Sequence, residues 1–302
     1  MPLKTVLIDK KAFISHGNWK APLQELLRGL CQYGVSVFDI SISDSFLHME
    51  SGSGDCLMIA DCEVTVQQAK ARNMAVLGYQ PAIPGIPADR QEQADRQERE
   101  KISSHLDMMV EGFEEVDYFF LNRVYQRFHH LPWIVMETER CILREMTLDD
   151  LDALYELYRP EIITHYIEGL HANREEEEIF TKAYIESMYR FYGYGLWVVI
   201  EKATGRLIGR AGLDHLDMED EICLTLGYVI AQEKQNQGYA TEVCRGILDY
   251  AEKELDFPSV CCLIQEENSV SIHLAEKLGF RFEKNVVHKG KKIRLYKKSR
   301  EK

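Results

Sequence analysis

The sequence predicts an α/β protein of two domains: a Rossmann-like parallel-sheet domain over residues 1–135 and a mixed α/β domain over residues 136–302. Three observations lead to this prediction. Short apolar runs alternate with helical patterns in the first half, which is typical of a doubly wound parallel sheet. The second half contains a hairpin pattern and ends in two strand-like segments. The proline-containing stretch HHLPW at residues 129–133 suits a boundary between the two.

The elements of the first domain follow from local patterns. Residues 19–34 place leucines at helical spacing and end in a glycine, a typical helix stop. Residues 64–73 predict a second helix. Residues 81–101 combine prolines with a charged segment poor in apolar residues, and they predict a flexible excursion suited to a solvated helix. Apolar runs predict strands at residues 5–9, 35–40, 56–61, 74–80 and 116–121.

The elements of the second domain are read in the same way. Thr147 is a good N-cap, and Asp149 and Asp150 suit the positive end of a helix dipole, so a helix is predicted at 147–158. A turn at residues 203–205 predicts a hairpin over 196–216. Further helices are predicted at residues 174–193, 241–254 and 268–279, and further strands at residues 140–146, 221–231 and 259–265 and in the segments FRFEKN and KKIRLYKK.

Composition and charge argue against some classes of function. The formal net charge of -13 disfavours a general binder of nucleic acid or membrane surfaces, since both need a positive field. No apolar run reaches the length of a membrane-spanning helix, and the N-terminus lacks the long apolar region of a signal peptide. The eight cysteines contain no C-x-x-C pair. A cytoplasmic protein with reduced cysteines is therefore expected.

The octapeptide QNQGYATE, residues 235–242, lies between an apolar strand-like run and a helical pattern. A helix start presents unpaired N–H groups and a partial positive charge, which suit a phosphate. Gly238 allows close approach of the backbone and unusual dihedral angles. The segment is therefore either an anion cradle or a simple strand–turn–helix connection.

Four motifs in order make residues 138–300 resemble a GNAT-superfamily N-acetyltransferase, in the branch that includes the ribosomal-protein N-terminal acetyltransferases. They are R-x-x-L-R at residues 140–144, G-R-L-I-G at residues 205–209, L-G-Y-V-I-A followed by Q-x-x-G-x-A-T-E at residues 226–242, and E-N-x-x-S-x-x-L-x-E-K-x-G-F at residues 267–280. The resemblance implies a GNAT fold and acetyl-CoA as the acyl donor. It makes the octapeptide the pyrophosphate loop, with Ala240 in place of the second glycine that many relatives carry.

The resemblance also implies site residues. In the family, the strand before the loop separates from its neighbour and pairs with the pantetheine arm. The implied cofactor-binding residues are Tyr228, Val229, Ile230, Gln235, Asn236, Gln237, Gly238, Tyr239, Ala240, Thr241 and Asn268. Asn268 is equally suited to cap the helix that follows it. Ser271 matches a serine near the cofactor sulfur that protonates the leaving thiolate, and its alternative is an ordinary first-turn serine.

The general base and the acceptor site are less defined. Thr225 stands where relatives often carry a glutamate. His215 is the candidate base because histidine side chains ordinarily change charge near neutral pH, and its alternative is a structural or solvent-facing residue. Asp214 and Glu221 are other polar groups to consider, and Tyr296 suits either the acceptor pocket or the core. The acceptor site is expected in the connection 159–174, beside the acidic run Glu175–Glu178, which suits either a cationic acceptor or a solvated helix start.

The first domain more loosely resembles a haloacid-dehalogenase-like (HAD-like) domain. VLIDKKAF and LMIADCEVTVQQAKARNMAVLGY match its first and last motifs. Asp9 suits the nucleophile, but Lys11 replaces the second aspartate, and Thr65 replaces the acid that would partner Asp61 at a magnesium ion. The resemblance therefore implies a degenerate domain used for binding, stability or dimerisation.

The expected function is that of an acetyl-CoA-dependent N-acetyltransferase. By resemblance, it transfers an acetyl group to a primary amine by direct attack in a ternary complex, and no metal is implied. The acceptor is a small molecule or a protein N-terminal amine. Two alternatives stay open: a non-catalytic acyl-CoA-binding sensor or scaffold, and a HAD-type phosphatase with an acetyltransferase appendage.

Overall fold

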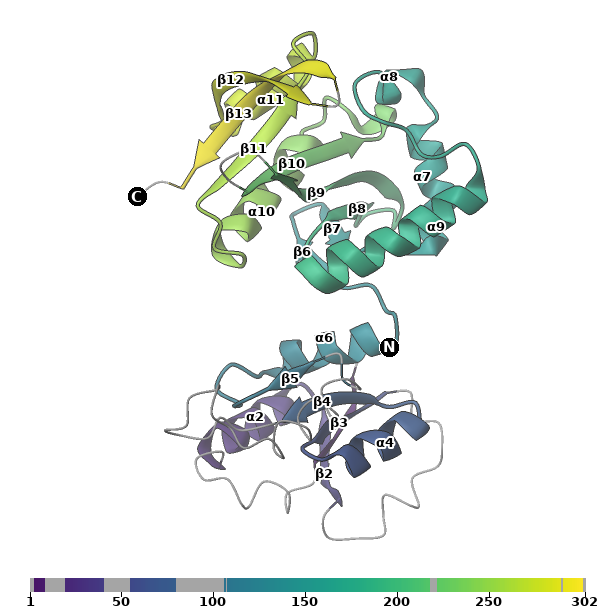
Figure 1. Cartoon of the computed structure of the whole chain (residues 1–302), viewed down its shortest axis with the longest axis vertical. Helices are drawn as coiled ribbons and strands as arrows, with labels where there is room; N and C mark the ends of the chain where they lie inside the picture. The colour runs from purple at the N-terminus through teal and green to yellow at the C-terminus, as the bar shows by residue number, and fades with distance from the viewer. Residues whose placement is uncertain are drawn as a thin grey trace. The chain divides into compact units, whose positions relative to one another are not determined.

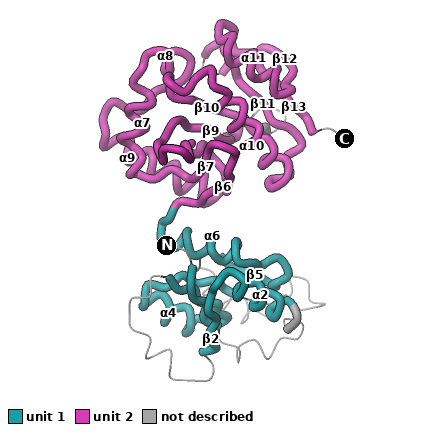
Figure 2. The backbone as a smooth tube through the Cα atoms, turned by 180° about the vertical axis from the view of Figure 1, so that it is seen from behind, with its two compact units in different colours: residues 1–131 teal, residues 132–302 magenta. Residues whose placement is uncertain are grey.

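The computed structural model describes residues 3–8, 20–40, 55–79, 106, 108–217, 222–288 and 290–300. The chain forms two compact units, residues 1–131 and 132–302 (Figure 2). The predicted division after residue 135 falls inside a strand that belongs to the second sheet, Ile134–Glu137. Among the described residues no helix has both the length and the apolar character needed to cross a membrane.

Unit 1 is a five-stranded parallel sheet with helices on both faces (Figure 1). Its strand order is β2-β1-β3-β4-β5, with β1 Thr5–Ile8, β2 Ser36–Asp39, β3 Cys56–Ala60, β4 Ala75–Tyr79 and β5 Met109–Val110. Helices α2 (Lys20–Gln32) and α6 (Tyr118–Phe128) pack into one apolar core, and α4 (Glu63–Ala71) packs into the other. Every residue of β3 and β4 is buried, as expected for strands covered on both sides. The predicted parallel sheet with helices is therefore confirmed.

One element of unit 1 was wrongly predicted as a strand. Residues 116–121 include the start of α6, whose N-cap Asp117 accepts a hydrogen bond from the Phe120 N–H at 2.7 Å. Leu121, Val124 and Tyr125 are buried at helical spacing. The aromatic run resembles a strand locally, but the cap and the buried face of the helix determine the outcome. The predicted excursion 81–101 lies outside the described residues.

Unit 2 contains a mixed eight-stranded sheet in the order β12-β13-β11-β10-β9-β8-β7-β6 (Figure 1). Its pairs are antiparallel except for β10 with β11. The strands are β6 Ile134–Glu137, β7 Cys141–Arg144, β8 Leu196–Glu201, β9 Leu207–Asp217, β10 Ile222–Ile230, β11 Ser259–Ile264, β12 Arg281–His288 and β13 Lys291–Ser299. This confirms the predicted hairpin and the predicted mixed α/β domain.

The helices of unit 2 lie on both faces of this sheet. They are α7 Leu151–Tyr158, α8 Glu161–Thr164, α9 Arg174–Tyr184, α10 Tyr239–Lys253 and α11 Ser269–Lys277, and π-helical turns at Ile185–Tyr192 continue α9. Tyr228 contacts α11, whereas Arg210, the cross-strand partner of the next residue, contacts α9. Successive strand residues point to opposite faces, so α9 and α11 cover opposite faces of β10.

Among the cysteines whose side chains the structure describes, the prediction of reduced thiols holds for six and fails at Cys261. Thiols outside any disulfide are found at Cys31, Cys56, Cys62, Cys141, Cys244 and Cys262. The prediction is wrong at Cys261, which is disulfide-bonded. Cys261 and Cys262 are neighbours in β11 and belong to different apolar clusters, because adjacent strand residues face opposite sides.

Candidate functional site

Strands β10 and β11 separate in the middle of the sheet of unit 2. Their pairing covers only Leu224 with Val260 and Thr225 with Cys261. Beyond Thr225, β10 continues to Ile230 in register with β9 on its other side. The last residues of β10 therefore turn one edge, with its backbone N–H and C=O groups, toward a widening gap. Such groups need partners, and an extended ligand can supply them.

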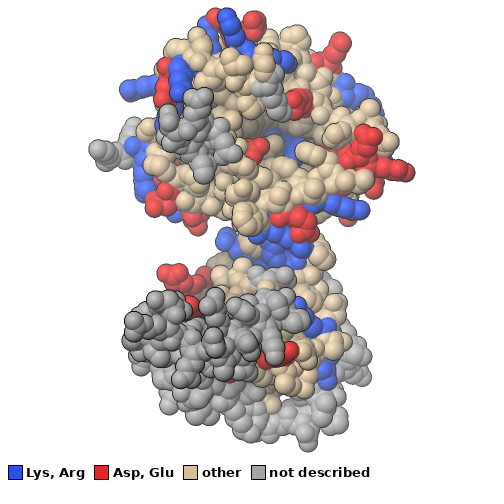
Figure 3. Space-filling view, viewed as in Figure 1, with Lys and Arg blue, Asp and Glu red and all other residues tan. Residues whose placement is uncertain are grey.

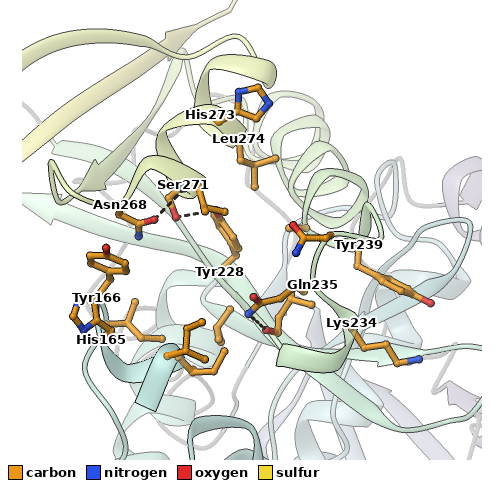
Figure 4. Close-up of a pocket in the computed structure, with 18 of the residues that line it drawn as sticks. His165, Tyr166, Tyr228, Lys234, Gln235, Tyr239, Asn268, Ser271, His273 and Leu274 are labelled. Carbon is orange, nitrogen blue, oxygen red and sulfur yellow. Dashed lines mark hydrogen bonds between the residues drawn. The ribbon is translucent and has the colours of Figure 1, made fainter. Parts of the chain in front are cut away.

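A cavity of about 970 Å³ opens at this gap (Figure 4). Four segments line it: α8 with the residues that follow, the end of β10, the start of α10 with the turn before it, and α11. The space-filling view shows charges of both signs around a hollowed face of unit 2 (Figure 3). A volume of this size is typical of sites for large organic ligands.

The start of α10 faces this cavity without a side-chain cap. Its N-cap is Gly238, with φ 84 and ψ −4, so the left-handed conformation is occupied by the residue that tolerates it best. The hydrogen bond from the Glu242 N–H to the Gly238 carbonyl, at 3.0 Å, closes the first turn. The N–H groups of Tyr239, Ala240 and Thr241 precede it and have no partner within the helix. This geometry fits a phosphate group.

Arg140 joins the turn before α10 to the rest of the sheet. Its Nε donates to Glu242 Oε2 at 2.6 Å, and its Nη1 donates to the Gln237 carbonyl at 3.1 Å. Its guanidinium lies 4.0 Å from the centre of the Tyr239 ring. Burial acts to raise the pKa of Glu242, but hydrogen bonds from Thr138 and Arg140 hold that pKa below its ordinary value. The carboxylate is therefore charged and holds the arginine against the turn.

Glu201 also holds the turn before α10, through hydrogen bonds to its carboxylate. Its carboxylate accepts from Lys234 Nζ at 2.6 Å, from the Tyr239 hydroxyl at 2.5 Å and from Thr204 Oγ1 at 2.7 Å. The hydrogen bond from Lys234 is the largest of the causes that lower the pKa of Glu201 to about 2. These hydrogen bonds connect the turn before α10 to the last residue of β8.

In Figure 4 a pair of hydroxyl groups is drawn between Tyr166, from the segment after α8, and Tyr239, at the start of α10. Tyr228, on β10, donates to Ser271 Oγ at 3.0 Å. The Ser271 N–H donates to Asn268 Oδ1 at 3.1 Å, so Asn268 caps α11 as predicted. Burial raises the pKa of Tyr228 to about 12, and this phenol stays a donor. Because Ser271 accepts this hydrogen bond, its own proton is directed elsewhere.

Residues 140–281 match the family model described as an acetyltransferase (GNAT) domain. The uncharacterized protein YkkB of Bacillus subtilis (strain 168) is 32% identical over 161 residues, which are 53% of this chain and 92% of YkkB. The chain belongs to the GNAT acetyltransferase family. Another relative, the uncharacterized N-acetyltransferase YoaA of the same organism, is 26% identical over 49% of this chain and 84% of its own. A solved GNAT-family acetyltransferase from Bacillus anthracis has 24% identity and a TM-score of 0.44, over 54% of this chain and 95% of that one.

Most of the predicted cofactor-binding residues of this N-acetyltransferase line the one cavity. They are Tyr228, Val229, Ile230, Gln235, Asn236, Gly238, Tyr239, Ala240, Thr241 and Asn268, and the predicted Ser271 lies with them. Gln237 is not among the lining residues. Its side chain donates to the Glu233 carbonyl at 2.7 Å, so it shapes the turn. These positions leave the roles of the residues as predictions.

The predicted general base, His215, lies outside the cavity. Its ring lies 4.6 Å from that of Tyr192, and its Nδ1 is 3.7 Å from Asp214 Oδ1. Thr225 donates to the Asp214 carbonyl at 3.2 Å. Tyr296 is buried in the main apolar core of unit 2. Glu221 lies outside the described residues.

The predicted acceptor connection reaches the cavity, and the acidic run beside it does not. Residues 161–167 line the cavity, including His165 and Tyr166 (Figure 4). None of Glu175–Glu178 is a lining residue. Glu177 is buried, and its carboxylate accepts from the His171 N–H at 2.8 Å. This carboxylate therefore stabilises the connection, and it belongs neither to an acidic rim of the cavity nor to a solvated helix start.

Sequence reasoning missed the partners that hold the site together. Tyr228 was predicted as a cofactor-binding residue of the strand, but its hydrogen bond to Ser271 was not predicted, and Arg140 and Glu201 had no assigned role. The strand alternation places the side chain of Tyr228 on one face, but its contact with Ser271 spans 43 positions along the chain. No local sequence pattern predicts such a contact. Conservation of a polar residue within a strand, seen across related sequences, is the kind of signal that would suggest it.

The HAD-like resemblance of unit 1 stays a prediction, since the matching family model begins at residue 140. Asp9 and Lys11 lie outside the described residues. Thr65 is buried, with its Oγ1 3.1 Å from Cys62 Sγ. Within the described ranges, no group of three or more His, Cys, Asp or Glu side chains is placed to hold a metal ion.

Proposed function

We propose that the cavity of unit 2 binds acetyl-CoA and that the enzyme transfers its acetyl group to a primary amine by direct attack in a ternary complex. Acetyl-CoA is the acyl donor of the GNAT family. The observation that carries the proposal is the continuity of the cavity. A single space of about 970 Å³ joins the uncapped start of α10, the open edge of β10 and the Ser271 hydroxyl. It also reaches residues 161–167, here called the α8 connection.

The lining residues fit this donor in three parts. The free N–H groups at the start of α10 suit a pyrophosphate. The open edge of β10 after Thr225 offers backbone hydrogen bonds to the amide-containing arm. Ser271 lies farther along, where the thioester would be held, with its proton available because its oxygen already accepts from Tyr228. The α8 connection is then the side from which the amine enters.

The proposed chemistry balances without an acyl-enzyme. The neutral amine nitrogen forms a bond to the acetyl carbon, the carbon–sulfur bond breaks, and the amine loses one proton to a base or to water. Ser271 donates a hydrogen bond to the sulfur as negative charge develops there. Tyr228 orients the Ser271 hydroxyl and remains protonated, since burial raises its pKa to about 12.

Calorimetric titration of the full chain with acetyl-CoA, and in parallel with CoA, tests the proposal. We expect both to bind, and we expect thiol release when a suitable amine is added. Binding of acetyl-CoA without thiol release for any amine would favour the acyl-CoA-sensor alternative. Folded protein that binds neither compound would refute the proposed cofactor site. Membership of the branch that acetylates ribosomal-protein N-termini remains a prediction, because it depends on the acceptor.

A further inference from the structure

Arg210 is a buried cation without a countercharge. It lies on β9, and only 8% of its surface is exposed. Its Nε has no hydrogen-bond acceptor, and no carboxylate of the described residues forms an ion pair with it. Buried charges in proteins are normally paired, since an unpaired one loses its hydration without compensation. An exception of this kind indicates that a partner is missing.

The neighbours of Arg210 are neutral hydroxyl groups rather than acids. The centre of the Tyr184 ring lies 5.2 Å from the guanidinium carbon, and the side chains of Tyr158 and Tyr189 also lie near it. The Tyr184 hydroxyl accepts from the Leu196 N–H at 2.6 Å, so its own proton is left to donate. Burial raises the pKa of Tyr184 to about 12. The cluster therefore combines one positive charge with neutral donors, the composition that suits an anion.

Arg210, Tyr158 and Tyr184 are not lining residues of the cavity, but the register of β9 with β10 places Arg210 beside one. Arg210 is directly opposite Val229 in the antiparallel register, and Val229 lines the cavity. Directly opposite residues lie on the same face of a sheet, about 4.5–5.5 Å apart at Cβ. Tyr158 ends α7, and the chain then leads to α8, which lines the cavity as well. Ser271 and Tyr228 meet on the other face of β10.

We propose that Arg210, with Tyr158 and Tyr184, binds a carboxylate of the acceptor. The acceptor class is then an amine that also carries a carboxylate, such as an amino acid or a peptide with an acidic group. A polyamine is disfavoured, because it would bring cations toward an unpaired buried guanidinium. The pyrophosphate of the acyl donor is not this anion, since the start of α10 already provides its cradle. The inference rests on the proposed function and narrows its acceptor.

Matched acceptors test the proposal in the full-length enzyme. The common L-amino acids and their carboxamides are compared by thiol release at fixed acetyl-CoA concentration. We expect kcat/KM to be higher for the carboxylate member of a pair by about 10- to 100-fold, the range that a charge-assisted hydrogen bond gives. Arg210→Met should remove this preference and leave the KM for acetyl-CoA unchanged. Turnover confined to amines without a carboxylate would overturn the proposal, and so would an Arg210→Met variant that slows both members of a pair equally.

A stability measurement tests the unpaired cation itself, whatever the acceptor. Arg210→Met keeps most of the apolar stem and removes the buried charge, so the Tm without acceptor should rise. Arg144→Met is the matched control, because Arg144 Nη2 lies 2.6 Å from Asp150 Oδ1, and its removal should lower the Tm. A lower Tm in Arg210→Met would refute the missing-partner argument. Failure of wild-type enzyme to bind acetyl-CoA would instead count against the proposed function. The Tm comparison would still test the unpaired cation, because it is made without acyl donor or acceptor.

Discussion

Helices α10 and α11 both begin at the same cavity, and their first residues differ. The start of α11 is capped by Asn268, whose Oδ1 accepts from the Ser271 N–H at 3.1 Å. The start of α10 is Gly238, which has no side chain to offer. One helix thus satisfies its own first turn and uses it to position a hydroxyl group. The other leaves its N–H groups for a ligand, at a cost to the stability of the helix alone.

At the start of α11 the protein itself supplies a hydrogen-bond acceptor for the first turn. At the start of α10 we expect the acyl donor to supply it. The uncapped turn is held from outside by Arg140 on Glu242 and by Lys234 on Glu201. Those contacts fix the loop without occupying its N–H groups. A capped start needs no such support, and α11 has its cap within its own sequence.

The largest effect is expected from Gly238→Glu. The side chain would strain a residue at φ 84 and would place a carboxylate where the pyrophosphate is expected. The Kd for acetyl-CoA should rise by more than roughly 100-fold, measured by calorimetry. Gly290→Glu is the control: Gly290 also has positive φ, at +75, and open space around its Cβ position. Equal affinity in wild type and Gly238→Glu would show that the cradle is misplaced.

A smaller effect is expected at the hydroxyl pair beside α11. Ser271→Ala should lower kcat about tenfold with little change in the Kd for acetyl-CoA, and Tyr228→Phe should lower it by about 2- to 10-fold. The double variant should be no slower than Ser271→Ala, because Tyr228 acts through the serine. Steady-state kinetics measure all three. Additive losses would mean that the two hydroxyl groups act separately.

The cap of α11 should matter for stability more than for binding. Asn268→Ala removes the acceptor for the Ser271 N–H and should cost about 0.5–2 kcal/mol in the free energy of unfolding. The Kd for acetyl-CoA should change far less than in Gly238→Glu. Asn268→Asp keeps an oxygen acceptor and should retain the stability in urea denaturation. A large loss of affinity with unchanged stability would make Asn268 a cofactor ligand rather than a cap.

Local sequence patterns predicted that helices begin near Gly238 and Asn268. The spacing from Asn268 to Gly279 and the glycine in QNQGYATE predict helix starts at residues 268 and 241, and the helices begin at Ser269 and Tyr239. Such starts are predictable because caps and turns depend on residues close in sequence. The separation of β10 from β11 could not be predicted. The run CLTLGYVIA has the same pattern whether its edge is paired or open. The strand at 116–121 failed because Asp117 offers a cap that outweighs the strand propensity of the aromatic residues.

The other features that the sequence did not predict depend on contacts between segments far apart in the chain. Arg140 and Glu242 are 102 positions apart, and Arg210 meets side chains from α7 and α9 only after folding. Charge composition gave no hint of an unpaired guanidinium, since a net charge of -13 suggests an excess of partners. The protein nevertheless surrounds this arginine with tyrosines. Burial and pairing are properties of the packed structure, which composition does not contain.

The smallest effect concerns the support of the uncapped start and its dependence on pH. The folded-state pKa of Glu201 is lowered from 4.5 to about 2, so this carboxylate stabilises the fold above pH 4.5 and loses that contribution as the pH falls toward 2. Glu201→Gln should make the free energy of unfolding less dependent on pH within that window and should weaken acetyl-CoA binding modestly. Glu283→Gln, at an exposed position of β12, is the control. Urea denaturation from pH 6 down to pH 3 measures the difference. If Glu201→Gln and wild type keep the same pH profile, the Glu201 carboxylate is not what holds the loop, and Arg140 with Glu242 must be its main support.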